Sequence, residues 1–239
     1  MTQNSPKLFN IFRKSIFFYL QHFLRILEIL SWIIIPGSVI FVLFFFWGLK
    51  EVQLYALMTI FFLSIPFLLV LLSLAILKLI DALNHQADSS SLTIYSQAFS
   101  VYMGSFLVIF LVFVKVSLWT LLMIVPGFLF SIYYSFSFMA YVLEGKKGMQ
   151  ALAFSKDLIQ PNFLKFFVFA GFLLIVMLPL FLSALFMSNY VYGLSLLTNM
   201  SIIMAAVSTV NLLWGILIVF PIVFLYFVYQ DFILCSRKK

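Results

Sequence analysis

A long stretch without any charged side chain sets the strongest limit on the fold, because no Asp, Glu, Lys or Arg occurs between Phe166 and Gln230. The rest of the chain is similar in character, with 65% hydrophobic residues, 9% charged residues and a mean hydropathy of +1.21. Soluble domains have about 25% charged residues. We therefore expect the chain to fold in a lipid bilayer, whose hydrocarbon core of about 30 Å is crossed by roughly 20 apolar residues of helix.

The apolar runs predict an all-α fold. Membrane-crossing segments are helices or closed barrels, and these runs of Leu, Phe, Ile and Val lack the apolar/polar alternation of barrel strands. Pro126-Gly127 is expected to separate the third span from a short fourth span. We predict a single integral membrane domain over residues 1–239, a polytopic helical bundle with six transmembrane helices at 29–49, 54–77, 103–125, 128–143, 166–187 and 202–229.

Amphipathic segments are expected beside the spans, at the membrane surface. Residues 5–25 combine a regular apolar side with basic and polar residues that fall mostly on the opposite side, a pattern typical of helices that lie in the headgroup plane. Met149 to Gln160 has a similar pattern. Ser89-Ser-Ser91 is expected to break or cap a helix before a half-polar segment, 92–102, that leads into the third span.

The distribution of basic residues predicts the topology. If the N-terminus is cytoplasmic, Lys50 is the only basic residue in an outside loop, against twelve in the inside regions. Cytoplasmic loops carry an excess of Lys and Arg. We therefore expect a multi-pass protein of the cytoplasmic membrane with both termini in the cytoplasm.

Lys115 is the charged residue that lies deep inside an apolar run. An ammonium group near the bilayer centre costs roughly 2.5–3.5 kcal/mol on insertion scales, so Lys115 should face the bundle interior, a wet cavity or a partner. It is a candidate contact for a lipid or a transported substrate. Alternatively, its stem reaches toward the headgroups, or Ser117 and nearby carbonyls satisfy it as a structural lysine. No acidic residue lies at matching depth in another span, which argues against a buried proton-relay pair.

A second group of candidates lies at the expected cytoplasmic rim. Lysines supply charge and small polar residues supply hydrogen bonds to a lipid phosphate. The alternative is a set of ordinary solvated loop charges. The candidate residues are Glu144, Lys146 and Lys147 in a turn and Ser155 on the following helix.

The sequence offers little for catalysis. It has no HExxH, GxSxG or Walker glycine loop and no carboxylate pair within a span. With Cys235 as the single cysteine it has no Cys-based metal cluster. The net charge of +7 is not gathered beside stacking aromatic residues in a polar domain, so we expect anionic lipids rather than nucleic acid as partners. No catalytic residue, cofactor or metal is expected.

Four segments carry a resemblance to a known family. They are IFRKSIFFYLQHFLRIL, SLTIYSQAF, IVPGFLFSIYYSFSFMAYVLEGKKGMQALAFSKDLI and PIVFLYFVYQDF. In this order they resemble the six-helix membrane domain that precedes the catalytic domain of some glycerophosphoryl diester phosphodiesterases, and related stand-alone bacterial integral membrane proteins. The resemblance implies a bacterial cytoplasmic membrane location. It implies no catalytic residue here, because the phosphodiesterase chemistry belongs to a separate soluble domain.

Two functions follow from these observations as hypotheses. The first is a non-enzymatic membrane protein that interacts with lipids, which are expected to be anionic, or that scaffolds a membrane protein partner. The second is a small transporter or permease for a lipid or amphiphile, with Lys115 lining the path. A transporter needs a polar cavity that reaches Lys115, whereas a scaffold should hold it in local contacts and tolerate Lys115→Met.

Overall fold

The computed structural model of the chain describes residues 8–32, 51–85, 90–195 and 219–236. Within these ranges the regular structure is helical throughout. Five helical stretches among the described residues are long and apolar enough to cross a membrane: Phe67–Asn84, Ser91–Leu122, Ile124–Glu144, Met149–Ser183 and Val219–Ser236. The all-α, multi-pass character predicted from the sequence is therefore confirmed. Most of the expected span 29–49, and the part of 202–229 before residue 219, lie outside the described residues.

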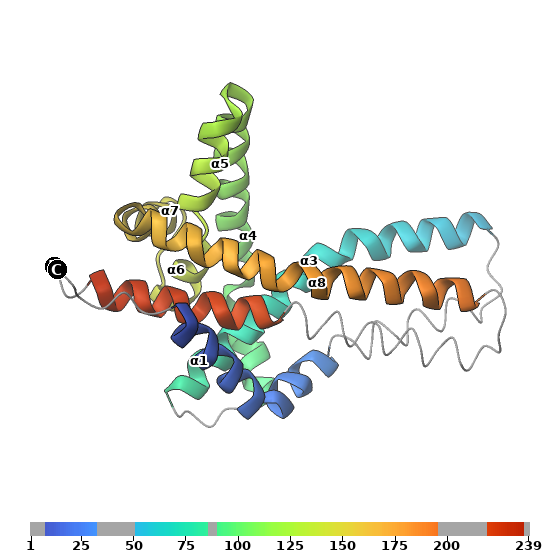
Figure 1. Cartoon of the computed structure of the whole chain (residues 1–239). Helices are drawn as coiled ribbons and strands as arrows, with labels where there is room; N and C mark the ends of the chain where they lie inside the picture. Colours follow the sequence, from blue (N-terminus) through green and yellow to red (C-terminus); the bar gives the residue numbers. More distant parts are fainter. Residues whose placement is uncertain (1–7, 33–50, 86–89, 196–218, 237–239) are drawn as a thin grey trace.

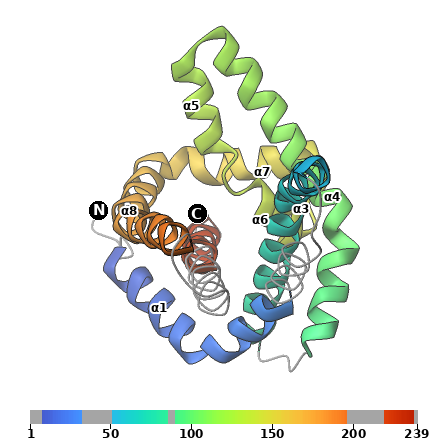
Figure 2. The ribbon, with the colours of Figure 1, turned by 90° about the vertical axis from the view of Figure 1, so that its right-hand side faces the viewer.

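The long helices run in two directions. Helix α8 (Phe163–Ser195) and the first part of α3 (Glu51–Asn84) run along the horizontal of Figure 1, and α8 is foreshortened in Figure 2. Helix α4 (Ser91–Leu122) and helix α5 (Ile124–Tyr133) form a hairpin that stands upright in both views. The α4–α5 hairpin therefore projects crosswise to α8.

The core forms where α3 meets the C-terminal helix, Val219–Ser236. Leu74, Ala75, Ile76 and Leu77 of α3 are fully buried. The ring of Phe136 makes edge-to-face contacts with Phe166, Tyr229 and Phe232, at centroid distances of 5.2, 5.3 and 5.9 Å. Edge-to-face packing is a preferred geometry of aromatic pairs, and here it joins the segment after α5 to α8 and to the C-terminal helix.

Helix α1 (Leu8–Gln21) is the first described part of the expected amphipathic segment 5–25. It is followed by a turn at His22 and a helical stretch over 23–32. Ile11, Ser15 and Tyr19 of α1 are buried, and the Phe12 ring lies 5.0 Å from that of Phe172 on α8. One face of α1 is thus covered by protein, while other apolar side chains of residues 8–32 stay exposed: Phe9, Phe17, Leu20 and Leu24. A position in the headgroup plane stays a prediction.

The described helices extend beyond some of the expected spans, and one predicted break is misplaced. Helix α3 continues past residue 77 to Asn84, and the half-polar segment 92–102 is continuous with the third span in α4. The break between the third and fourth spans lies at Met123, whose φ and ψ of −160° and 138° are extended, and not at Pro126-Gly127. Pro126 lies in the first turn of α5, where a missing N–H is tolerated.

The expected fourth span, 128–143, is not one helix. Helix α5 ends at Tyr133, residues 134–136 form a turn, and helix α6 (Ser137–Glu144) follows. After a further turn comes α7 (Met149–Ile159), the predicted second amphipathic helix, which continues through η1 (Gln160–Asn162) into α8. The Ser89-Ser-Ser91 prediction holds in part, because Ser90 caps α4 by accepting a hydrogen bond from the Thr93 N–H.

Candidate functional site

The turn from Glu144 to Gly148 has a fixed backbone. Gly145 and Gly148 have φ values of 66° and 49°, which side-chain-bearing residues rarely adopt. The N–H groups of Gly145 and Lys146 both bind the carbonyl oxygen of Ala140, the latter at 3.2 Å. The side chains of Glu144, Lys146 and Lys147 are exposed. The structure thus places a carboxylate and two ammonium groups at the surface on one hydrogen-bonded turn.

The turn lies against α4. A Cβ atom placed on Gly148 would meet Leu107 and Leu111 at 3.8 Å, so these α4 side chains face the turn. Leu111 is four residues, or one helical turn, before Lys115 on α4. The two candidate groups predicted separately from the sequence therefore lie along the same side of α4.

Lys115 and Lys146 both contact rings of one small apolar cluster. The Lys115 ammonium lies 5.7 Å from the centroid of the Tyr134 ring, and the Lys146 ammonium lies 5.7 Å from that of Phe154. Tyr134 belongs to the cluster, and Phe154 packs against it. The contact distance of about 6 Å or less is that of cation–π pairs. The half-buried Lys115 therefore has an aromatic partner within the protein, and the described residues show no ion pair to it.

Ser155 is buried, unlike the exposed Lys146 and Lys147. It is 0% exposed, its hydroxyl donates to the Tyr133 carbonyl at 2.7 Å, and it accepts the Phe136 N–H at 3.0 Å. These two backbone groups lie at the turn between α5 and α6. Because the turn interrupts the helix, they lack helical hydrogen-bond partners. Ser155 is thus bound to the α5–α6 turn, and contact of its hydroxyl with a lipid phosphate stays a prediction that this position does not favour.

Sequence reasoning missed the role of Lys78, which directly follows the expected second span at 54–77. The half-buried Lys78 ammonium donates to the Val142 carbonyl at 3.1 Å. Val142 lies in the last turn of α6, where carbonyls lack helical partners and a positive charge is favourable. Lys78 therefore joins the core helix α3 to the end of α6, next to the Glu144–Gly148 turn. The position of Lys78 in an apolar periodic run was the available signal.

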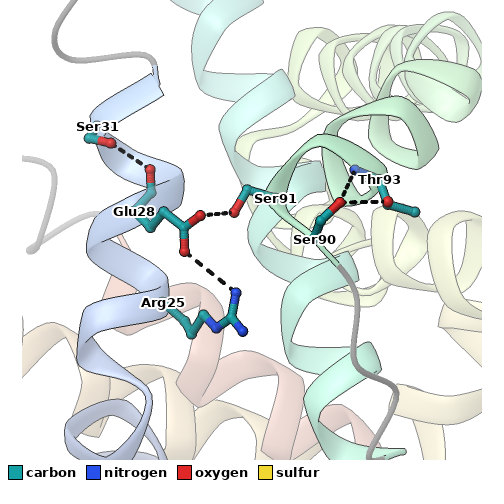
Figure 3. Close-up of polar contacts among 6 residues, drawn as sticks. All are labelled: Arg25, Glu28, Ser31, Ser90, Ser91 and Thr93. Atoms are coloured by element: carbon teal, nitrogen blue, oxygen red, sulfur yellow. Dashed lines mark hydrogen bonds and ion pairs between the residues drawn. The ribbon is translucent and has the colours of Figure 1, made fainter.

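Glu28 was also missed. Figure 3 shows its carboxylate between Ser91 at the start of α4 and Arg25, whose guanidinium lies 3.6 Å from it. The Ser91 hydroxyl donates to Glu28, and the Tyr95 hydroxyl donates to the Ile29 carbonyl at 2.6 Å. A carboxylate is favoured near a helix N-terminus. These contacts fasten stretch 23–32 to the start of α4.

The comparisons with known proteins identify no relative. The chain has no significant match among protein-family models, curated proteins or solved structures. Among the described residues, no group of three or more His, Cys, Asp or Glu side chains is arranged to hold a metal ion. The features that bear on function are therefore the Glu144–Gly148 turn and the α4–α5 hairpin.

Proposed function

We propose that this protein is a non-enzymatic integral membrane protein that binds anionic lipid headgroups at the Glu144–Gly148 turn. The observation that carries the proposal is the exposed pair Lys146 and Lys147 on a turn packed against α4. Only 11% of the residues in the apolar 18-residue stretch of α4 are buried inside the protein. Exposed apolar surface of this extent requires lipid or another apolar partner, and lysines beside it attract anionic headgroups.

The finer features of the proposal come from the sequence. The excess of basic residues in alternate loops supports a cytoplasmic location for both termini and for this turn. The resemblance to the membrane domain of glycerophosphoryl diester phosphodiesterases supports a bacterial cytoplasmic membrane. A membrane protein partner that docks on the lipid-facing helices would be compatible with the same role, because a scaffold also has to stay anchored at the membrane surface.

Transport is the weaker candidate. A transported substrate would need Lys115 to be available in a polar path, whereas its ammonium lies over the Tyr134 ring. This contact favours a structural lysine. We therefore propose lipid binding and not substrate passage as the function.

Native mass spectrometry of the protein released from lipid nanodiscs tests the proposal. The nanodiscs contain equal amounts of phosphatidylglycerol and phosphatidylcholine. Lys146→Ala/Lys147→Ala should lose retained phosphatidylglycerol, whereas the matched double change Lys238→Ala/Lys239→Ala removes the same charge and should keep it. Equal retention by the wild type and by Lys146→Ala/Lys147→Ala would overturn the proposal.

A further inference from the structure

The end of the α4–α5 hairpin is apolar and exposed. The side chains of Leu121 and Val125 are 85% and 69% exposed, and the residues between them, Leu122, Met123 and Ile124, are exposed to a similar degree. Thr120 is the one residue with a hydroxyl group between positions 118 and 130, and its hydroxyl donates to the Val116 carbonyl of its own helix at 2.8 Å. The turn of a hairpin that emerges into water usually carries polar residues. This turn carries none.

The hairpin beyond Lys115 is also short. From Lys115 to Leu122, α4 rises about 10 Å, and the 10 residues of α5 rise about 15 Å. A hydrocarbon core is about 30 Å thick. If the Met123 turn reached water on the far side, the Lys115 ammonium would lie only about 10 Å from that surface, inside the hydrocarbon. Five exposed apolar side chains would then meet water.

The base of the hairpin has the residues of a membrane interface. Lys115 lies over the Tyr134 ring, and Lys and Tyr are typical of the boundary between hydrocarbon and headgroups. The Glu144–Gly148 turn packs on Leu107 and Leu111, one helical turn or more before Lys115. The lysines at the base therefore match anionic headgroups, while the tip matches acyl chains.

Contacts within the hairpin pack its two helices closely together. The rings of Trp119 and Phe130 stack with their centroids 4.7 Å apart. A Cβ atom on Gly127 would lie 2.7 Å from the Thr120 Cα, so the two helices touch along their backbones near the tip. The hairpin projects crosswise to α8 (Figures 1 and 2). In a membrane that α8 crosses, the hairpin therefore runs along the membrane plane and not from one side to the other.

We propose that the α4–α5 hairpin is embedded, from its Lys115–Tyr134 base to its Met123 tip, in the acyl chains of the leaflet that faces the Glu144–Gly148 turn, and does not emerge on the far side. The occupant of its exposed apolar surface is lipid. Lys115 then reaches headgroups from a hairpin that stays within one leaflet, which explains a lysine in the middle of an apolar run. The expected crossings fall from six to four, and both termini stay on one side.

The inference rests on the membrane setting of the proposed function but not on headgroup binding by Lys146 and Lys147. Loss of the proposed lipid retention would leave the hairpin inference intact. Conversely, a hairpin that crosses the membrane would leave lipid binding at the turn intact. The two proposals therefore fail in different experiments.

Cysteine accessibility tests the position of the tip. In full-length protein carrying Cys235→Ser, single cysteines are introduced by Val125→Cys or Leu121→Cys at the tip, Asp157→Cys on the near side and Lys50→Cys on the expected far side. A membrane-impermeant maleimide is applied to right-side-out and to inverted vesicles. We expect both tip variants to be unlabelled in both vesicle types and labelled after detergent is added, while the two control variants are each labelled from opposite sides.

Labelling of Val125→Cys together with Lys50→Cys would show that the hairpin crosses the membrane and would overturn the inference. Labelling of Val125→Cys from the same side as Asp157→Cys would show that the tip lies in water, and this result would also overturn the inference. A disulfide-linked dimer formed through Val125→Cys or Leu121→Cys under oxidation would identify a second copy of the chain, and not lipid, as the occupant.

The depth of Trp119 gives an independent measurement. A variant that keeps only this tryptophan, through Trp32→Phe, Trp47→Phe and Trp214→Phe, is reconstituted into vesicles of lipids brominated at different positions along the acyl chain. We expect the strongest quenching of its fluorescence by bromines along the chain of one leaflet. Absence of quenching by any brominated lipid would show that protein or water surrounds the hairpin, and would overturn the inference.

Discussion

The Ser155 hydroxyl donates to the Tyr133 carbonyl oxygen at 2.7 Å, from a helix that begins sixteen residues later in the chain. The same hydroxyl accepts the Phe136 N–H at 3.0 Å. One buried side chain on α7 thus satisfies both backbone groups that the interruption between α5 and α6 leaves without helical partners. The angle between the projecting hairpin and the core depends on this interruption.

Ser155→Ala should destabilise the protein. Removal of the hydroxyl leaves the buried Phe136 N–H and Tyr133 carbonyl unpaired, at a cost of about 1–3 kcal/mol. The free energy of unfolding, measured by SDS titration of the protein in detergent, gives the change. Ser135→Ala is the matched control, because the exposed Ser135 hydroxyl only donates to the Ser131 carbonyl of its own chain segment. Equal unfolding free energies for the two variants would contradict the assigned role of Ser155.

Lys78→Met should weaken the attachment of α6 to α3. The ammonium that binds the Val142 carbonyl is lost, while an apolar stem of similar length remains. The expected loss is about 1 kcal/mol of unfolding free energy, since the group is half-buried and acts at a helix C-terminus. Lys147→Met, on an exposed lysine, is the control in lipid-free detergent. Faster hydrogen exchange of the Val142–Gly145 amides in Lys78→Met alone would confirm the local effect.

Glu28 and Ser91 should be energetically coupled. A double-mutant cycle with Glu28→Ala and Ser91→Ala isolates their interaction, which we expect to be about 1 kcal/mol for a hydrogen bond to a partly exposed carboxylate. The cycle of Glu28→Ala with Ser96→Ala, an exposed serine on the same helix, should show additive changes. Additivity in the first cycle would show that the contact does not hold stretch 23–32 against α4.

Particular residues show how much of the fold was predictable. The existence of long helices follows from apolar runs that need lipid, and Ser90 was recognisable as part of a helix-capping serine run. The break at Met123 was not, because Pro126 tolerates both the end of one helix and the first turn of the next. The local sequence predicts that a helix forms, whereas the residue at which the helix is interrupted depends on tertiary contacts.

The candidate site was predictable only where the charge is exposed. Glu144, Lys146 and Lys147 share a tight turn because Gly145 and Gly148 accept positive φ values, and glycines beside charges are visible in the sequence. The hydroxyl of Ser155 and the ammonium of Lys78 bind backbone groups 22 and 64 residues away in the chain. Such partners depend on how the helices cross, which no local pattern encodes.

Acid should destabilise the N-terminal region through His22. Burial lowers the pKa of the His22 imidazole from its ordinary value of 6.5. Because the folded pKa lies below the unfolded one, the unfolded state binds the proton more readily as the pH falls. The contribution to stability is therefore fully present above about pH 6.5 and is lost below it.

Thermal unfolding of α1, followed by fluorescence of a probe attached through Asn10→Cys in a Cys235→Ser background, measures this pH dependence. The wild-type protein should have a lower thermal unfolding midpoint at pH 5.5 than at pH 7.5, and His22→Gln should reduce this difference. His85→Gln leaves His22 in place and should show the full difference. The same pH dependence in the presence and absence of His22 would contradict the prediction.

Substitution of three glycines should produce a definite order of effects on stability. Gly127→Ala brings a Cβ against the Thr120 Oγ1 and to 2.7 Å from the Thr120 Cα, and backbone cannot move aside as a side chain can. We expect a loss of about 1–3 kcal/mol, as for other overpacked sites. The Cβ of Gly104→Ala meets the Tyr141 hydroxyl, which is the far end of a ring that can turn away, so the cost of this change should be smaller.

Gly171→Ala is the control within this series. No atom lies within 4 Å of a Cβ built at Gly171 on α8, and alanine favours helix over glycine by up to about 1 kcal/mol. Unfolding free energies in one detergent should therefore rank Gly171→Ala at or above the wild type, Gly104→Ala below it and Gly127→Ala lowest. An unchanged free energy of unfolding in Gly127→Ala would mean that the backbones of α4 and α5 do not touch near the tip. The hairpin would then lack the close contact that holds its apolar end together in the leaflet.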